Sequence, residues 1–201
     1  TIKDHKRIIF NGNGYDDAWV KEAEKRGLLN LKSTPEALTK ILDEKNVKVF
    51  EKFGVYSKVE LTSRYEIHNE NYSKIINIEA LTMLDMAKKL YLPSASAYAK
   101  QLAETIAAKK AAGGADDSYE ADLLKKVSAL TASIYQKVQK LEKDVDGAAK
   151  VADAGENALY YRNTVFADMG ELREDVDTLE GLVPAREWPV PSYAELLFSV
   201  K

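Results

Sequence analysis

Apolar side chains recur every three or four residues over most of the chain, and this spacing is typical of amphipathic helices. The first long run lies in residues 57–91, which contain no glycine or proline and are expected to form one helix. Pro93 follows, and because proline has no backbone N–H and its ring crowds the preceding turn, it should kink or break the helix. The apolar positions are Leu61, Tyr65, Tyr72, Ile75 or Ile76, Met83, Met86 and Leu90, and after Pro93 they resume at Tyr98, Leu102 and Ile106.

Two further runs with the same spacing follow the turn signal AAGGADDS at 111–118. The first is close to a heptad seam, with Leu123, Val127, Leu130, Ile134, Val138, Leu141 and Val145. The second begins after a break near residues 147–155 and contains Tyr161, Val165, Met169, Leu172, Val176, Leu179 and Val183. Long amphipathic helices joined by short turns pack as antiparallel neighbours, so we expect a mainly α fold, an antiparallel helical bundle with long helices. Its core should contain Leu130, Ile134, Leu141, Val165, Met169, Leu172 and Val176.

The beginning of the chain carries signals for shorter helices. Residues 16–26 have acidic side chains at the start and basic ones at the end, which predicts a helix. Ser33 or Thr34 can cap a second helix that has Pro35 in its first turn. A third helix is expected at 47–53 and should stop at the glycine that follows.

The end of the chain should leave the helical pattern. Prolines at 184, 189 and 191 interrupt helix formation, and the final ELLFSV predicts a short terminal strand or extended tail. A strand needs a partner for its backbone groups. Within this chain the only candidate is the opening run RIIF at 7–10, and otherwise the sheet that the strand joins is expected to lie outside this chain. The expected domains are a connection with short helices at 1–56, a long-helix bundle at 57–182 and a proline-rich tail with a final strand at 183–201.

Composition excludes several classes of protein. With 45% hydrophobic and 30% charged residues, the 201-residue chain has the balance of a soluble globular domain. Its 29 basic and 32 acidic residues are interleaved, so there is no basic field for nucleic acid. No apolar run approaches the roughly 20 residues that a membrane-spanning helix needs. The absence of cysteine excludes disulfides and thiolate metal ligands and fits a cytoplasmic protein.

Residues that could carry chemistry are few and scattered. His5 and His68 are the only histidines, too far apart in sequence to suggest a metal cluster or a catalytic triad. The loop NGNG at 11–14 could offer backbone donors to an anion, but it lacks the lysine of a P-loop, and Asp16 and Asp17 would repel phosphate there. We interpret this loop as a turn between a strand and a helix.

The remaining candidates also have structural interpretations. The carboxylate pairs Glu22 with Glu24 and Asp116 with Asp117 lack the apolar surroundings that would raise a pKa for acid–base catalysis. Tyrosines and methionines in the helical runs fit core stripes and need no cofactor to explain them, namely Tyr160, Tyr161, Met83 and Met86. We therefore expect no catalytic, cofactor-binding or metal-binding residue in this chain.

Several segments resemble glutamine synthetases. The stretch TPEALTKILDEKNVKVFEKFGVYSKVELTSRYEIHNENYSKIINIEA is similar to helices that follow the catalytic core in this family, and PVPSYAELLFSV resembles the family's ending. Between them, about residues 81–182 have no counterpart in the shorter enzymes. Direct resemblance to type III glutamine synthetases is carried by KRIIFNGNGYDDAWVKEAEKRGLLNLKSTPEAL, INIEALTMLDMAKK and LVPAREWPVPSYAELLFSV. Together with the start at Thr1, this suggests the C-terminal region of a longer protein.

The resemblance implies an ATP-dependent ligase that joins ammonia to glutamate through a γ-glutamyl phosphate. It places ATP and Mg²⁺ or Mn²⁺ in an upstream catalytic domain, within a homo-oligomer of stacked hexameric rings. In such an enzyme this region would contact its own catalytic domain and neighbouring subunits. None of the family's catalytic motifs occurs in these residues, so we expect the chain alone to be inactive and to serve subunit structure and oligomer assembly.

Two other classes remain as alternatives. A free-standing helical scaffold or adaptor would bind a partner helix, and its chain would be complete alone with its ends paired to each other. An enzyme with its own site in the bundle would need inward-facing carboxylates and histidines at helical spacing. The apolar seams disfavour this last class.

Overall fold

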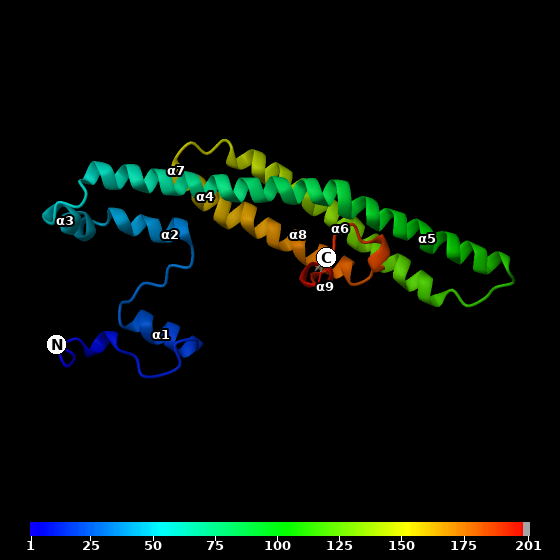
Figure 1. Cartoon of the computed structure of the whole chain (residues 1–201), viewed down its shortest axis with the longest axis horizontal. Coiled ribbons are helices and arrows are strands. Elements are labelled where there is room, and N and C mark those ends of the chain that lie inside the picture. The colour runs from blue at the N-terminus through cyan, green and yellow to red at the C-terminus, as the bar shows by residue number, and fades with distance from the viewer. Residues whose placement is uncertain (199–201) are drawn as a thin grey trace. The chain divides into compact units, whose positions relative to one another are not determined.

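The computed structural model describes residues 1–198, and in this range the regular secondary structure is entirely helical (Figure 1). The mainly α fold expected from the sequence is therefore confirmed. The chain forms two compact units, residues 1–65 and the residues from 66 onward, which we describe separately. The boundary between them lies inside helix α4 (Lys58–Met86).

The first unit consists of short helices joined by turns. The three helices expected here all form, although the third begins earlier than predicted, at Glu44. Gly54 follows this helix with a φ of +64°, in the left-handed region that glycine adopts without strain. The elements are η1 (Lys6–Ile8), α1 (Asp17–Lys25), α2 (Thr34–Leu38), η2 (Thr39–Leu42) and α3 (Glu44–Lys52).

The strand expected at residues 7–10 does not form, so this prediction was wrong. The backbone carbonyls of Arg7 and Ile9 instead accept hydrogen bonds from the guanidinium of Arg26, at 3.0 and 2.9 Å. Phe10 stacks on Trp19 of α1 with ring centroids 4.2 Å apart. A side chain thus satisfies the carbonyls that a neighbouring strand would otherwise have bound.

The second unit begins with a long helical stretch that continues through Pro93. A π-helical turn, η3 (Ala87–Tyr91), joins α4 to α5 (Leu92–Ala111), and within it the N–H of Leu92 donates to the carbonyl of Ala87. Pro93 is the second residue of α5 and directly follows this π turn, a wider turn of the kind found at irregularities within helices. The chain therefore stays helical at Pro93, and the irregularity takes the form of a wider turn rather than a break.

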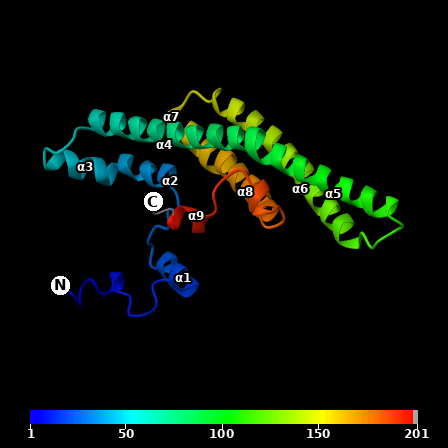
Figure 2. The same cartoon turned by 45° about the vertical axis from the view of Figure 1, so that its right-hand side comes forward.

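The other long helices run back and forth along this stretch. After the turn at 112–117, α6 (Ser118–Ala148) packs antiparallel to α5, and α8 (Phe166–Glu180) packs antiparallel to α6 (Figures 1 and 2). Helix α7 (Ala154–Tyr160) and a second π turn, η4 (Tyr161–Val165), lead from α6 into α8. The expected antiparallel bundle is thus present, with α6 as its middle helix.

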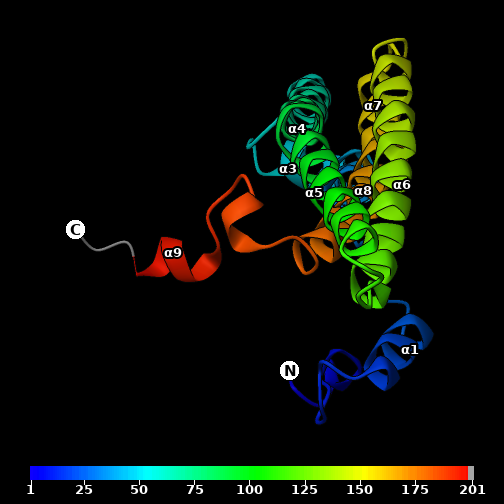
Figure 3. The ribbon, with the colours of Figure 1, turned by 90° about the vertical axis from the view of Figure 1, so that its right-hand side faces the viewer.

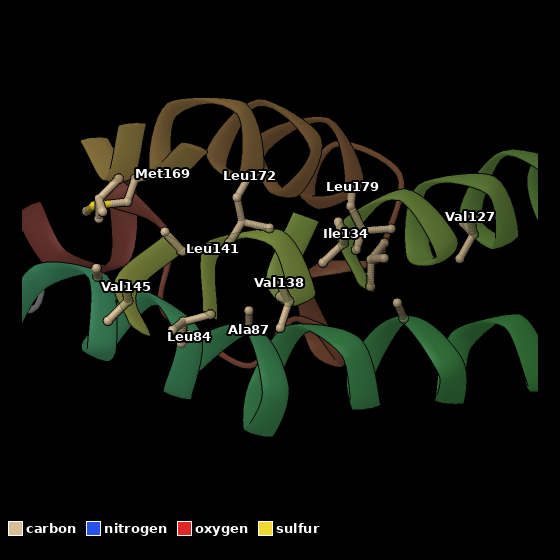
Figure 4. Close-up of a cluster of buried hydrophobic side chains, with 14 of the residues drawn as sticks. Leu84, Ala87, Val127, Ile134, Val138, Leu141, Val145, Met169, Leu172 and Leu179 are labelled. Carbon is tan, nitrogen blue, oxygen red and sulfur yellow. The ribbon is translucent and has the colours of Figure 1, made fainter. Parts of the chain in front are cut away.

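The core of the second unit lies on the two sides of α6. Figure 4 shows the apolar side chains of α6 between those of α8 and those of the α4–α5 stretch. Five of the seven expected core residues are buried, namely Ile134, Leu141, Val165, Met169 and Leu172. The other two, Leu130 and Val176, are half-buried and pack against the same cluster. The heptad spacing therefore identified the core correctly.

The tail after α8 contains a short 3₁₀ turn, η5 (Ala185–Glu187), and a helix, α9 (Tyr193–Leu197). The strand expected over ELLFSV is therefore wrong for Glu195 to Leu197, while residues 199–201 lie outside the described residues. The cause is a capping box that sequence reasoning overlooked. The backbone N–H of Ser192 donates to Glu195 Oε2 at 2.7 Å, and the N–H of Glu195 donates to Ser192 Oγ at 3.3 Å.

Two helical glycines in different surroundings test this packing. Gly170→Ala in α8 should raise the free energy of unfolding by about 0.5–1 kcal/mol, because apart from the adjacent residues and the helix's own backbone no atom lies within 4 Å of the added Cβ. Gly147→Ala in α6 should give no such gain, because its Cβ would lie 2.7 Å from Tyr160 Oη. Urea denaturation followed by circular dichroism measures both changes. In a Tyr160→Phe background the Gly147→Ala change should become stabilising, and equal effects of Gly147→Ala in both backgrounds would contradict the predicted contact.

Candidate functional site

The two histidines do not form a site. His5 and His68 are both exposed, and His68 lies on α4 in the way expected of a surface helix residue. Within residues 1–198, no group of three or more histidine, aspartate or glutamate side chains is arranged to hold a metal ion. In the same range, no helix is both long enough and apolar enough to cross a membrane.

The glycine-asparagine loop is a turn stabilised by its own side chains. Asn13 Oδ1 accepts a hydrogen bond from the backbone N–H of Tyr15 at 3.0 Å, and Asp16 Oδ1 accepts one from Ala18 at 3.1 Å. The backbone donors at the start of α1 are therefore bound by an acidic cap rather than open to an anion. This agrees with the interpretation of the loop as a turn, although a 3₁₀ turn rather than a strand precedes it.

Three of the remaining candidates from the sequence have structural partners. Asp116 accepts a hydrogen bond from the backbone N–H of Ser118 at 3.0 Å, at the start of α6. The hydroxyl of Tyr161 donates to Asn77 Oδ1 at 3.1 Å, which joins η4 to α4. Glu22 lies 2.7 Å from the guanidinium of Arg26 on the same helix. These side chains close turns and helix contacts, and none of these contacts brings a nucleophile together with a base.

A group of charged side chains does lie at the interface of α6 and α8, and the sequence did not reveal it. Asp168 of α8 is only 4% exposed, and its Oδ1 accepts a hydrogen bond from Lys140 Nζ of α6 at 2.7 Å. Lys140 also lies 3.3 Å from Glu171 Oε2, and hydrogen bonds to Asp168 and Glu171 raise the pKa of Lys140. The i, i+3 spacing of two acidic residues on α8 was visible in the sequence, but the position of the lysine opposite them required the helix register.

Burial raises the pKa of Asp168. The hydrogen bond from Lys140 opposes this shift and the neighbouring Asp144 carboxyl adds to it, so that the net direction is upward. Asp175, two turns further along α8, behaves in the opposite way. Burial raises its pKa, but hydrogen bonds from Lys137 and Ser133 outweigh burial and the net shift is downward. The two carboxyl groups therefore hold α8 against α6 with opposite dependence on pH.

An apolar groove lies between α4, η3 and α8, and its volume is about 420 Å³. Met83 and Met86, which the sequence assigned to core stripes, line this groove together with Met169. Both are half-buried rather than fully enclosed. The sequence could show their helical spacing, but it could not show that the side chains opposite leave a space.

Helix α4 also carries apolar side chains on the face opposite the core. Three residues of α4 in the second unit, Ile76, Ala80 and Leu84, are buried in the core cluster. With 3.6 residues per helical turn, four other apolar residues of α4 lie on the opposite side of the helix, and their side chains are between 51% and 63% exposed. This α4 outer face consists of Ile67, Ile75, Ile78 and Leu81.

Comparison with known proteins identifies the family of the chain. Residues 1–110 match the family model of the glutamine synthetase C-terminal domain, which is more than half of the chain. The chain therefore belongs to the glutamine synthetase C-terminal domain family. The expected resemblance to glutamine synthetases is confirmed.

Full-length relatives agree with this assignment and include a type-3 enzyme. A glutamine synthetase of Butyrivibrio fibrisolvens is 42% identical over 202 residues, covering 100% of this chain and 29% of the relative. A type-3 glutamine synthetase of Dictyostelium discoideum is 36% identical, covering 98% of this chain and 28% of the relative. A glutamine synthetase of Bacteroides fragilis is 32% identical, covering 96% and 27%. The chain thus spans less than a third of the length of these relatives.

The carboxyl groups of Asp168 and Asp175 are expected to change the stability of the fold in opposite directions as pH rises. The folded chain holds the Asp168 proton more tightly than the unfolded chain, so this group favours folding at low pH, and the contribution is lost as pH rises through its raised folded-state pKa. Asp168→Asn should therefore gain stability relative to the wild type as pH rises from acid to neutral. Asp175→Asn should lose stability relative to the wild type over the same rise, because its lowered pKa stabilises the fold above the ordinary carboxyl pKa and this is lost in acid.

Urea denaturation of the three proteins at a series of pH values measures both trends. The two substitutions have the same size and lie on the same helix, so each is the control for the other. Parallel pH dependence of the two variants would contradict the opposite shifts.

Proposed function

We propose that this chain is the non-catalytic C-terminal helical region of a type III glutamine synthetase, a cytoplasmic enzyme that makes glutamine from glutamate, ammonia and ATP. Its role is to contact the rest of the enzyme, both its own catalytic domain and neighbouring subunits of the oligomer. The donor set of residues 1–198 does not fit a divalent-metal site. In this proposal no step of the reaction is assigned to the chain, and the remainder of the enzyme binds ATP and Mg²⁺ or Mn²⁺.

The observation that carries this role is the α4 outer face. A helix that is apolar on two opposite sides is normally buried on both. The core cluster covers one side of α4, whereas Ile67, Ile75, Ile78 and Leu81 are more than half exposed. Since the second unit already forms its core without this face, the face is suited to a contact outside the unit.

The relatives support this assignment by their length. Each is a glutamine synthetase more than three times as long as the matched segment, so the greater part of such an enzyme lies outside this chain. An apolar face of this kind on one part of a long chain is suited to packing against the other parts. The first unit also has exposed apolar side chains, namely Val49, Phe53, Val55 and Val59, which are between 53% and 78% exposed.

The chain alone should not make glutamine. Incubated with ATP, glutamate, ammonia and Mg²⁺ or Mn²⁺, it should form no glutamine above the rate without protein, while the full-length enzyme that contains it should be active. Glutamine is measured by chromatography and phosphate release in parallel. Activity of the chain alone would overturn the non-catalytic assignment, and an inactive full-length enzyme would favour the free-standing scaffold.

Charges on the α4 outer face should weaken the assembly of the full-length enzyme. Ile67→Asp/Ile75→Asp should shift the native mass toward smaller species and lower the activity, because carboxylates cannot be buried in an apolar contact without a partner. Analytical ultracentrifugation measures the mass. Neither position lines the methionine groove.

Tyr119→Asp/Tyr135→Asp is the matched control, since these residues are 69% and 53% exposed on α6 and their substitution introduces the same two charges on another helix. Both variants should retain the helical circular dichroism of the wild type. Unchanged mass and activity in Ile67→Asp/Ile75→Asp would refute a contact through this face.

A further inference from the structure

The methionine groove is defined by all three methionines of the chain. The sequence contains only Met83, Met86 and Met169, and all of them line the groove of about 420 Å³ between α4 and α8. Ile78, Tyr91 and Val176 complete its apolar wall, and Glu79, Arg173 and Asp177 stand among the lining residues as charged groups. The groove thus has the composition of a binding surface, with an apolar floor and polar groups around it.

Methionine suits such a surface because its unbranched, polarisable side chain adapts to the shape of an apolar partner. An apolar cavity of about 150 Å³ accommodates one benzene-sized group. The methionine groove therefore has room for two or three apolar side chains. Grooves of this kind typically bind the apolar side of a short helix.

The chain contains a short helix with exposed apolar side chains. At the end of α9, Leu196, Leu197 and Phe198 are 58%, 72% and 81% exposed. A helix of five residues is too short to be stable without packing, even with the Ser192–Glu195 capping box. Figure 3 shows α9 set apart from α4 and α8, so these side chains are not used in the core of the second unit.

The tail that carries α9 leaves the bundle at the edge of the groove. Trp188 stacks on Tyr91 with ring centroids 5.2 Å apart, and Tyr91 itself lines the groove. The hydroxyl of Ser94 donates to the carbonyl of Glu187, which fixes the same point. Only residues 189–192 separate Trp188 from α9, and they span at most about 14 Å when extended. Met86 precedes Tyr91 by five residues, about 7.5 Å along a helix, so α9 can reach the methionines.

We propose that α9 docks into the methionine groove of its own chain and places Leu197 and Phe198 against Met83, Met86 and Met169. The structure shows the open state of this strap, with groove and tail both exposed to solvent. In the docked state the Trp188–Tyr91 stack is the fixed end of the strap, and the capping box keeps α9 helical. Docking removes apolar surface of both partners from water, which is its driving force.

Paramagnetic NMR on the 201-residue chain tests this proposal directly. The chain has no cysteine, so Ser199→Cys gives a single attachment point for a nitroxide label next to Phe198. With ¹³C-methyl methionine, the only three methionine signals all come from the groove. We expect the label to broaden all three signals strongly in its oxidised form and to leave them sharp once the nitroxide is reduced.

Leu197→Ser/Phe198→Ser in the labelled chain should restore most of the lost intensity, because it removes the side chains that dock and leaves the capping box intact. Tyr119→Ser is the matched control, since Tyr119 is 69% exposed on α6 and does not line the groove, and broadening should persist there. All variants should keep the circular dichroism of the wild type, because none of these residues belongs to the buried cluster.

A mixed sample distinguishes the chain's own tail from that of a second copy. Chains that carry ¹³C methionine but no spin label are mixed with spin-labelled chains that carry no ¹³C. Sharp signals in this mixture support docking within one chain if the signals are broadened in the first sample, in which every chain carries both the spin label and ¹³C methionine. Broadening in the mixture as well assigns the groove to the tail of another copy, and no broadening in either sample leaves the groove without this occupant. Both of these results overturn the proposal.

Discussion

Burial of the apolar seam of α6 is the interaction on which the rest of the second unit depends. Val127, Ile134 and Leu141 are completely buried, and each contributes roughly 1.5–3 kcal/mol relative to an exposed position. Because the seam faces α8 on one side and the α4–α5 stretch on the other, it holds all these helices in one core (Figure 4). Neither outer layer could keep its own apolar side chains from water without this middle helix.

Ion pairs at the edge of this seam set the register of α6 against α8. Lys137 lies 2.8 Å from Asp175, and Lys140 lies 2.7 Å from Asp168. The lysines advance along α6 while their partners go back along α8, as antiparallel helices require. A slip of one heptad would leave the nearly buried Asp168 without its lysine, and an unpaired buried charge is far less favourable than a shifted apolar contact. Apolar burial thus holds the helices together, and charge selects one alignment.

Prediction from the sequence succeeded where one periodic signal decides the structure. The heptad spacing placed the long helices and named core residues such as Ile134 and Leu172, since three- or four-residue spacing has one favourable arrangement in a bundle. It failed where two signals compete. The terminal ELLFSV suits a strand by composition, but Ser192 and Glu195 form a capping box and the helix wins. At Pro93 the rule that predicts a kink or a break does not specify the π turn that the structure has there.

The candidate surfaces were harder to predict for a different reason. Periodicity shows that α4 has many apolar residues, but which of them face the core depends on where α6 and α8 lie. Ile76 and Ile78 differ by two positions, and one is buried while the other is 63% exposed. A groove is an absence of side chains, and it therefore leaves no trace in the spacing of the residues around it.

The two apolar surfaces of α4 share one residue, and this links the proposed contacts. Ile78 belongs to the α4 outer face and also lines the methionine groove. A segment docked in the groove therefore borders the face that is proposed to meet the rest of the enzyme. Each of the two contacts changes how much apolar surface around Ile78 is left exposed for the other. If the docked segment and the rest of the enzyme bind side by side, the shared burial of Ile78 makes each contact favour the other. If they overlap, they compete for Ile78. The surface of α4 around Ile78 is therefore a position at which a docked tail would border the proposed assembly contact directly, without a conformational change in the core.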